Sequence, residues 1–247
     1  MKFESNIKLG RPFINYAHRG ASSYAPENTM LSFMLGLTMG ANGIETDVQK
    51  TKDNHLVLFH DDTLKRVTGK DGAIADYTLS ELKSFWVSSL GLSDRIVTLD
   101  EFLSSFCKKK IYFAIELKVF GIAKEVVEKI YAYGVQDRCT ITAFDYENLL
   151  EVKKLEQKIK TGYLTADASD EVVEKLLLDG VTELCPHAKD CTAEKVKKWH
   201  DKGLSVRAWG VSSEDLMKAV YDSGADGMTV NFPDKLVDYI GSKISVE

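Results

Sequence analysis

A repeated pattern of a helical segment, a glycine and a short apolar run limits the fold of this sequence more than any other feature. Runs rich in β-branched or aromatic residues follow within a few residues of five glycines, which are Gly40, Gly134, Gly180, Gly203 and Gly224. Helices often end at a left-handed position that glycine occupies without steric cost, and such runs are typical of strands. The last three glycines follow one another at intervals of about 22 residues, which indicates a repeating βα unit.

The repeat predicts eight strands, each followed by a helix. The expected strands are residues 13–19, 43–49, 111–118, 138–143, 159–164, 182–185, 204–209 and 226–230. The expected helices are residues 27–39, 98–107, 121–133, 145–157, 169–179, 192–202, 212–223 and 234–241. Strict alternation predicts an α/β fold, a closed (β/α)₈ TIM barrel, with an open doubly wound sheet as the alternative.

An extra segment separates the second unit from the third. The interval from Gly40 to Gly134 is about twice what two units need, so we expect an insertion at residues 50–97, after the second strand. It would emerge at the carboxyl end of the barrel, where such folds place their chemistry. The sequence therefore predicts a single catalytic domain over residues 1–247, in which residues 50–97 form an inserted cap subdomain.

The charge balance and the distribution of apolar residues limit the kinds of partner that this chain could bind. Lys and Arg number 32 against 37 Asp and Glu, a net charge of −5, so no basic field is available for phosphate backbones. No apolar stretch reaches the roughly 20 residues that span a bilayer. Glu4, Lys8 and Arg11 stand where a secretory leader would need an apolar core. We expect a cytoplasmic monomer or homodimer with no membrane span and no nucleic-acid partner.

Three acidic side chains are expected to meet inside the barrel. Glu45 and Asp47 lie two residues apart on the second strand, so their side chains point to the same face. Glu116 and Lys118 repeat this spacing on the third strand. Either pair alone could be a salt-bridged structural feature. Together, three converging carboxylates form an oxygen-rich site suited to one divalent cation, Mg²⁺ or Ca²⁺, rather than Zn²⁺.

Two histidines are expected on the same rim. His18 ends the first strand, and His60 closes the run LVLFH after the second. A histidine at a strand end often only satisfies hydrogen bonds, but two of them near the carboxylates favour an acid/base pair. Arg19 offers a planar fork for anionic oxygens; its alternative is a structural ion pair with Glu27.

The spaced motifs resemble one known family, the bacterial glycerophosphodiester phosphodiesterases, over Tyr16 to Pro233. The motifs are His18-Arg19-Gly20, Pro26-Glu27-Asn28-Thr29, Glu45-Thr46-Asp47, His60-Asp61 and Glu116-Leu117-Lys118. The resemblance implies a TIM barrel with a small inserted subdomain. It also implies metal-dependent hydrolysis of small glycerophosphodiesters, such as glycerophosphocholine and glycerophosphoethanolamine, to sn-glycerol 3-phosphate and an alcohol.

The resemblance also implies roles for individual residues. By matching motif, the metal ligands are Glu45, Asp47 and Glu116, the acid/base pair is His18 and His60, and the phosphate-binding residues are Arg19 and Lys118. Trp209 matches a tryptophan that borders the glycerol pocket, although it could be only a large aromatic at the barrel rim. Asn28 could be no more than a helix cap.

Two positions depart from the family pattern. Gly210, Val211 and Ser212 stand where relatives often carry Asn, and Asn231 stands where the late strand usually ends in Thr-Asp. We expect both departures to alter the alcohol side of the pocket and to leave the metal and histidine set untouched.

The sequence leaves alternatives open for both the mechanism and the function. The nucleophile is either the glycerol 2-hydroxyl, through a cyclic phosphate, or water. The alternative functions are a phosphodiesterase for another lipid head group and a non-catalytic barrel that binds phosphorylated ligands. Retention of both histidines and all three acids favours the enzyme.

Overall fold

The computed structural model describes residues 7–8 and 11–244. The outermost parts of the predicted domain 1–247 therefore lie outside the described residues. A short antiparallel hairpin, β1 (Ile7–Lys8) and β2 (Arg11–Pro12), precedes the main sheet.

Eight parallel strands form a closed barrel within residues 11–244. They are β3 (Ile14–His18), β4 (Gly43–Lys50), β8 (Tyr112–Leu117), β9 (Cys139–Ala143), β10 (Lys160–Thr165), β11 (Glu183–Pro186), β12 (Ser205–Val211) and β13 (Gly227–Val230). Each strand pairs with the next one in this series, and β13 pairs with β3 to close the ring. The predicted TIM barrel is confirmed, and the open doubly wound alternative is wrong.

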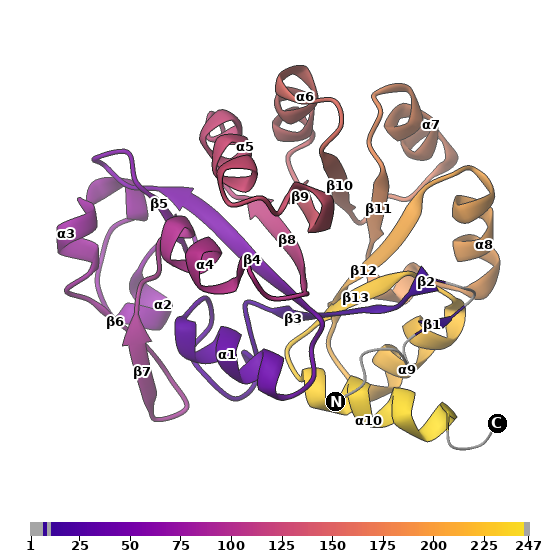
Figure 1. Ribbon diagram of the computed structural model, residues 1–247, viewed down its shortest axis with the longest axis horizontal. Coiled ribbons are helices and arrows are strands. Elements are labelled where there is room, and N and C mark those ends of the chain that lie inside the picture. The colour runs from indigo at the N-terminus through magenta and orange to yellow at the C-terminus, as the bar shows by residue number, and fades with distance from the viewer. Residues whose placement is uncertain (1–6, 9–10, 245–247) are drawn as a thin grey trace.

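Helices follow the barrel strands and surround them (Figure 1). They are α1 (Met30–Thr38), α4 (Leu99–Phe106), α5 (Ala123–Ala132), α6 (Tyr146–Leu155), α7 (Asp170–Leu178), α8 (Ala193–Asp201), α9 (Glu214–Ser223) and α10 (Pro233–Ile244), with short 3₁₀ turns η3 (Gln136–Arg138) and η4 (Ala188–Asp190). Polar residues cap the N-termini of several helices. At α4, for example, the Thr98 side chain accepts a hydrogen bond from the backbone N–H of Glu101. The five glycines of the repeat all have left-handed φ, between 66° and 98°.

The segment between β4 and α4 holds short elements around an apolar cluster of its own. They are β5 (Leu56–Leu58), α2 (Lys65–Thr68), η2 (Ile74–Asp76), α3 (Leu79–Leu82), β6 (Trp86–Ser89) and β7 (Leu92–Arg95). Strand β5 extends the main sheet by pairing antiparallel with β4. This insertion lies beside α1 and α4 at one side of the barrel (Figure 1). Its role as a cap over the site stays a prediction.

The main apolar core lies between the barrel and its helices. Within this core, a close contact between helix α1 and strand β3 helps to position the site. Gly36 of α1 packs against β3, where an added Cβ would lie only 2.7 Å from the Cβ of Ala17. Side chains in a packed core cannot give way cheaply at such a separation. Glycine at this position therefore lets α1, and the segment leading into it, lie directly against the strand that ends in His18.

A buried polar cluster fills part of the barrel interior. Arg207 on β12 is only 1% exposed, lies 3.4 Å from a Glu183 carboxylate oxygen and donates to the Cys185 sulfur at 3.3 Å. Its guanidinium also lies over the Tyr16 ring. Buried charges are stable only when paired in this way, so Arg207 supplies a fixed positive charge inside the barrel.

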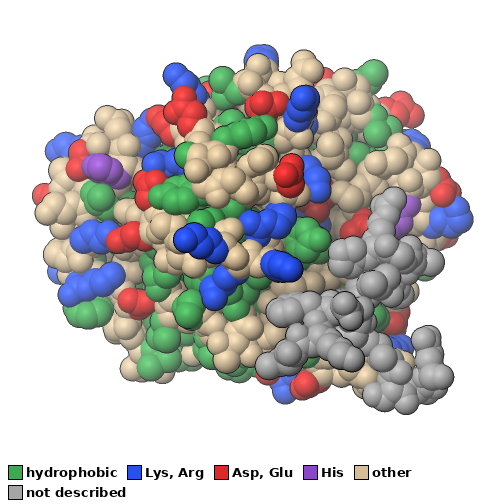
Figure 2. Space-filling view, viewed as in Figure 1, with side chains coloured by type: hydrophobic (Ala, Val, Ile, Leu, Met, Phe, Trp, Pro, Cys, Tyr) green, Lys and Arg blue, Asp and Glu red, His purple; other side chains and the backbone are tan. Residues whose placement is uncertain are grey.

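On the face seen in Figure 2, several basic side chains lie together near the centre, and basic and acidic side chains intermingle around them. Within residues 7–8 and 11–244, no helix combines the length and the apolar character that crossing a bilayer would require.

Candidate active site

Three buried carboxylates converge from two neighbouring strands. Glu45 and Asp47 lie on β4, and the register places Asp47 opposite Glu116 of β8. The exposed fractions are 3%, 0% and 6% for Glu45, Asp47 and Glu116. One oxygen from each of the three lies within 4.8 Å of the others. The convergence expected from strand parity is therefore present.

Burial and mutual repulsion strongly affect these acids. Burial, followed by the charges of Asp47 and Glu116, raises the pKa of Glu45 well above its ordinary value. Burial and Asp47 likewise raise the pKa of Glu116 to about 7, against the opposing charge of Lys118. Burial also works against ionised Asp47, but Arg19, His60 and Lys118 outweigh it and hold the Asp47 pKa below its usual range. A cation at this cluster would allow all three acids to ionise together.

The oxygen atoms of Asp47 provide a test of whether a cation fits. Its Oδ2 accepts a hydrogen bond from Asn28 Nδ2 at 2.8 Å and lies 3.2 Å from Arg19 Nε. Its Oδ1 is buried and has no hydrogen-bond partner among the described residues. Buried carboxylate oxygens are normally satisfied, and an all-oxygen donor set is the kind that Mg²⁺ and Ca²⁺ prefer. These residues fit a divalent cation.

His18 ends β3 directly opposite Glu45 in the β3–β4 register. Its Nδ1 is 2.6 Å from Asn231 Oδ1, and its Nε2 is 3.8 Å from Glu45 Oε2. An acceptor oxygen at Nδ1 favours the tautomer in which Nε2 carries the lone pair. Partial burial of the ring at the end of the barrel, with help from the Arg19 charge, lowers the pKa of His18 to about 4, so the ring is neutral near neutral pH.

The contact with Asn231 corrects one expectation from the sequence. The departure at Asn231 was expected to leave the histidines untouched, and this is wrong because Asn231 is the direct partner of the His18 ring. The reason is barrel closure, which places the end of β13 beside the end of β3.

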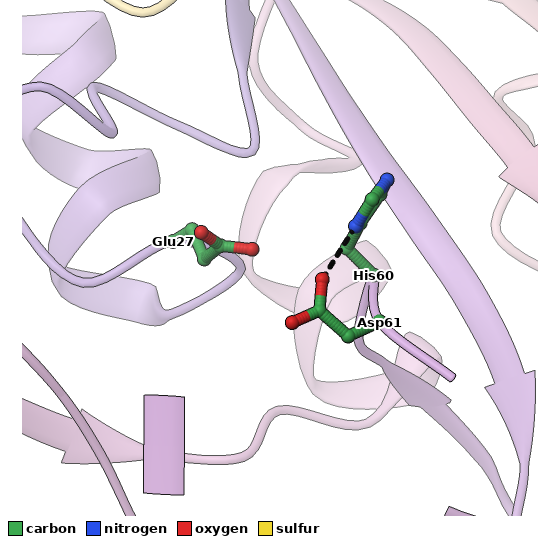
Figure 3. Close-up of side chains that lie close together, drawn as sticks. All are labelled: Glu27, His60 and Asp61. Atoms are coloured by element: carbon green, nitrogen blue, oxygen red, sulfur yellow. Dashed lines mark hydrogen bonds and ion pairs between the residues drawn. The ribbon is translucent and has the colours of Figure 1, made fainter. Parts of the chain in front are cut away.

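His60 follows β5 and faces the site from the insertion side. Its Nδ1 is 2.8 Å from Asp61 Oδ1. Figure 3 shows the other ring nitrogen on the far edge of the imidazole, away from Asp61. Gln49 of β4 holds this segment by donating to the carbonyl oxygens of Phe59 and Asp61 at 3.1 and 2.9 Å. His60 therefore has a fixed backbone and one fixed ring nitrogen.

Arg19 and Lys118 supply two positive charges beside the acids. Arg19 Nη1 donates to Glu27 Oε1 at 3.0 Å, so the ion pair considered from the sequence is present, and the same side chain also faces Asp47. Lys118 Nζ donates to Glu116 Oε1 at 2.9 Å. Both side chains are about one-sixth exposed.

A cavity of about 280 Å³ connects most of these groups. It is lined by His18, Arg19, Glu45, His60, Glu116, Phe144, Leu164, Arg207, Trp209, Gly210 and Thr229. One part of the lining is ionisable and the other part is apolar or aromatic. Small-molecule sites combine these two kinds of surface in this way.

Trp209 is held rigidly at the aromatic part of this lining. Its Nε1 donates to the Thr165 carbonyl at 3.2 Å, and its ring packs edge-to-face against Phe144 and His187. Gly210 has φ +72°, and an added Cβ there would lie 2.8 Å from His187 Nε2. Glycine after Trp209 therefore leaves room for the imidazole that supports the tryptophan.

Asn28 has a role that the sequence did not reveal. Thr29, not Asn28, caps α1, so the helix cap considered as an alternative at Asn28 is wrong. Asn28 instead has φ +55°, donates to Asp47 Oδ2 and accepts from Thr46 Oγ1 at 2.7 Å. The left-handed backbone, which asparagine tolerates better than most residues, turns this amide toward the strand and away from the helix.

Replacing Asn28 by glycine is expected to weaken binding of Mg²⁺ or Ca²⁺ by about 10- to 100-fold, the usual cost of losing a residue that orients a ligand. Glycine keeps the left-handed backbone and removes only the amide that holds Asp47. Calorimetric titration measures the effect. Asn54→Gly is the matched control, because Asn54 has φ +63° in the turn that joins β4 to β5. Equal affinity in both variants would contradict the assigned role.

Comparison with known proteins identifies similar sequences and structures. Residues 18–235 match the profile described as the glycerophosphoryl diester phosphodiesterase family. A relative from Caldanaerobacter subterraneus subsp. tengcongensis, named glycerophosphodiester phosphodiesterase, is 32% identical over 91% of this chain and 96% of its own length. A relative of the same name from Bacillus altitudinis is 34% identical over 90% of this chain and 96% of its own length.

A solved structure gives a similar result. The phosphodiesterase of Oleispira antarctica, determined in complex with the product sn-glycerol-3-phosphate, is 29% identical. It superposes with a TM-score of 0.83, covering 92% of this chain and 96% of that one.

Proposed function

Because this chain belongs to the glycerophosphoryl diester phosphodiesterase family and hydrolyses glycerophosphodiesters, we propose that one divalent cation and two histidines carry out its reaction. The proposed cation ligands are Glu45, Asp47 and Glu116, and the proposed acid/base pair is His18 and His60. The observation that carries the proposal is that both histidines line one small cavity together with two of the three clustered acids.

The proposed substrates are small glycerophosphodiesters such as glycerophosphocholine and glycerophosphoethanolamine. Hydrolysis breaks the bond between phosphorus and the alcohol oxygen and gives sn-glycerol 3-phosphate and the free alcohol. The product named in the Oleispira antarctica complex supports this substrate class. The cavity volume of about 280 Å³ suits a glycerophosphate portion better than a lipid with acyl chains.

When bound, the cation acts as a Lewis acid that offsets the negative charge of the phosphoryl oxygens. Arg19 and Lys118 add fixed positive charge on the same oxygens, which stabilises the charge that develops in the transition state. Trp209 forms the apolar wall against which the glycerol carbons rest. We assign these three residues to substrate binding.

The two histidines transfer protons at different oxygen atoms, one on the nucleophile and the other on the departing alcohol. The neutral ring of His18 has an unprotonated Nε2, which allows it to take a proton from an attacking hydroxyl. His60 has the opposite edge of its ring directed away from Asp61. One neutral histidine deprotonates the nucleophile, while the other enters the step as the imidazolium and gives the proton on its cavity-facing nitrogen to the departing alcohol oxygen. Each such transfer is typically worth ~10²–10⁴-fold in rate.

A coupled assay for released glycerol 3-phosphate tests this function. The purified chain is assayed with several head groups, then with EDTA, and then with Mg²⁺ or Ca²⁺ restored. We expect turnover of glycerophosphocholine or glycerophosphoethanolamine that EDTA abolishes and one of the cations restores. Full activity in EDTA would contradict the metal assignment, and release of phosphate products from acylated lipids alone would contradict the substrate class.

A further inference from the structure

Arg66, on the short helix α2 of the insertion, contacts two acids that each touch a residue of the active site. Its Nη1 and Nη2 donate to the two carboxylate oxygens of Glu27, both at 2.7 Å. Its Nε and Nη2 donate to Asp61 Oδ2 and Oδ1 at 2.5 and 2.8 Å. One guanidinium therefore holds two carboxylates in a bidentate manner, which lysine cannot do.

Each of these two acids also contacts a residue of the active site. Asp61 Oδ1 pairs with His60 Nδ1 at 2.8 Å, and Glu27 Oε1 accepts from Arg19 Nη1 at 3.0 Å. The contacts form one continuous ion-pair chain, which runs through His60, Asp61, Arg66, Glu27, Arg19 and Asp47. Arg66 links the two halves of this chain through Asp61 and Glu27, and among the six members it is the one that lies on α2.

Without Arg66 the two acids would face each other. One ligand atom from each of Glu27, His60 and Asp61 lies within 4.8 Å of the others. Figure 3 shows the Glu27 carboxylate directed toward the other two side chains. The side chains of Glu27 and Asp61 are only 16% and 22% exposed, so solvent would screen their repulsion poorly. The guanidinium groups of Arg66 and Arg19 together balance the charges of these two acids, and for this reason we do not assign a second cation to this group. The hydrogen bonds from Arg66, and then that from His60, also lower the pKa of Asp61 to about 2.

The insertion core fixes where Arg66 lies. Its neighbours Leu64 and Val67 are buried in the apolar cluster of the insertion, while the Arg66 side chain is half-exposed and reaches across to Glu27. Packing of α2 therefore sets the position of the guanidinium, and the guanidinium sets the position of Asp61.

We propose that Arg66 is a positioning residue, which fixes Asp61 so that His60 keeps its proton on Nδ1 and presents Nε2 to the cavity. This inference rests on the proposed function, because it assigns a role to His60. In this role the insertion contributes to the reaction by placing one guanidinium at the rim of the barrel.

The test compares Arg66→Met, Arg66→Lys and the control Lys65→Met. Lys65 lies on the same helix and pairs with Asp71, away from the ion-pair chain. We expect Arg66→Met to lower kcat by about 10- to 100-fold, an effect of the size seen when the partners that orient metal-binding histidines are lost. Arg66→Lys should restore part of it. Lys65→Met should retain wild-type kcat. Thermal unfolding of each variant shows the fraction that is folded.

A second readout separates positioning from stability. Nitrogen-15 NMR of histidine-labelled protein, in mildly alkaline buffer, reports the His60 tautomer without any assay. We expect one tautomer, protonated on Nδ1, in the wild-type chain and a mixture of both in Arg66→Met. An unchanged tautomer, or a loss of activity that only follows the unfolded fraction, would overturn the inference.

The two proposals fail in different ways. If His60→Ala keeps wild-type turnover, the acid/base assignment itself is wrong. If His60→Ala abolishes turnover while Arg66→Met retains both wild-type kcat and a single tautomer, only the positioning role is wrong.

Discussion

Alanine in place of His18 or His60 is expected to lower kcat by about 10²–10⁴-fold, because each ring would transfer a proton in the rate-limiting chemistry. The rings lie on one cavity but are held by different partners, Asn231 for His18 and Asp61 for His60. Neither side chain belongs to the apolar core, since both are about one-third exposed. The variants should therefore fold normally and bind the cation with nearly wild-type affinity.

Steady-state kinetics on glycerophosphocholine or glycerophosphoethanolamine measures this effect, with thermal unfolding and cation titration as parallel readouts. His55→Ala is the matched control, because His55 is a surface histidine beside a carboxylate, Asp53, at 3.8 Å. It should keep wild-type turnover. Wild-type kcat in both His18→Ala and His60→Ala would remove the acid/base pair from the mechanism.

Neutral replacements of the clustered acids are expected to remove cation binding, and turnover with it. The variants are Glu45→Gln, Asp47→Asn and Glu116→Gln, each of nearly unchanged shape. Loss of a direct ligand should cost more than the about 10- to 100-fold typical of residues that only orient a ligand. Asp47→Asn should have the largest effect, because Asp47 is the acid whose pKa is held low and so carries a full charge.

Glu45→Gln and Glu116→Gln should fold as well as the wild-type chain when no cation is present. Burial already raises the pKa of Glu45 and Glu116, so a neutral amide resembles the state that these side chains adopt without a cation. Calorimetric titration with Mg²⁺ and Ca²⁺ measures affinity, and thermal unfolding in EDTA measures stability. Glu125→Gln, a surface acid paired with Lys50, is the control. Retained affinity in all three variants would exclude this cluster as the metal site.

The general architecture could be predicted because it depends on local patterns. Glycines and polar caps mark the ends and the starts of most of the helices around the barrel. Eight repeats of one unit then leave few alternatives to a barrel. The convergence of Glu45, Asp47 and Glu116 could also be predicted. Side-chain alternation fixes the first two on one face, and adjacent parallel strands bring the third to the same end.

Other features depend on contacts that no local pattern encodes. Asn231 touches His18 only because the last strand closes the ring against the first. Arg66 reaches Glu27 across a loop whose path the sequence does not specify. Asn28 looked like a helix cap because asparagine favours that position, and only its left-handed backbone directs the amide to Asp47.

We propose that Glu45, Asp47 and Glu116 hold one cation at the carboxyl end of the barrel, and the assigned chemistry depends on this cation. Anomalous diffraction from crystals grown with Mn²⁺, which shares the oxygen preference of Mg²⁺, tests it most directly. We predict one strong anomalous peak in contact with all three carboxylates, and none at Glu27, His60 and Asp61, where Arg66 already supplies the positive charge. A peak at the second group, or no peak among the three acids, would contradict the account.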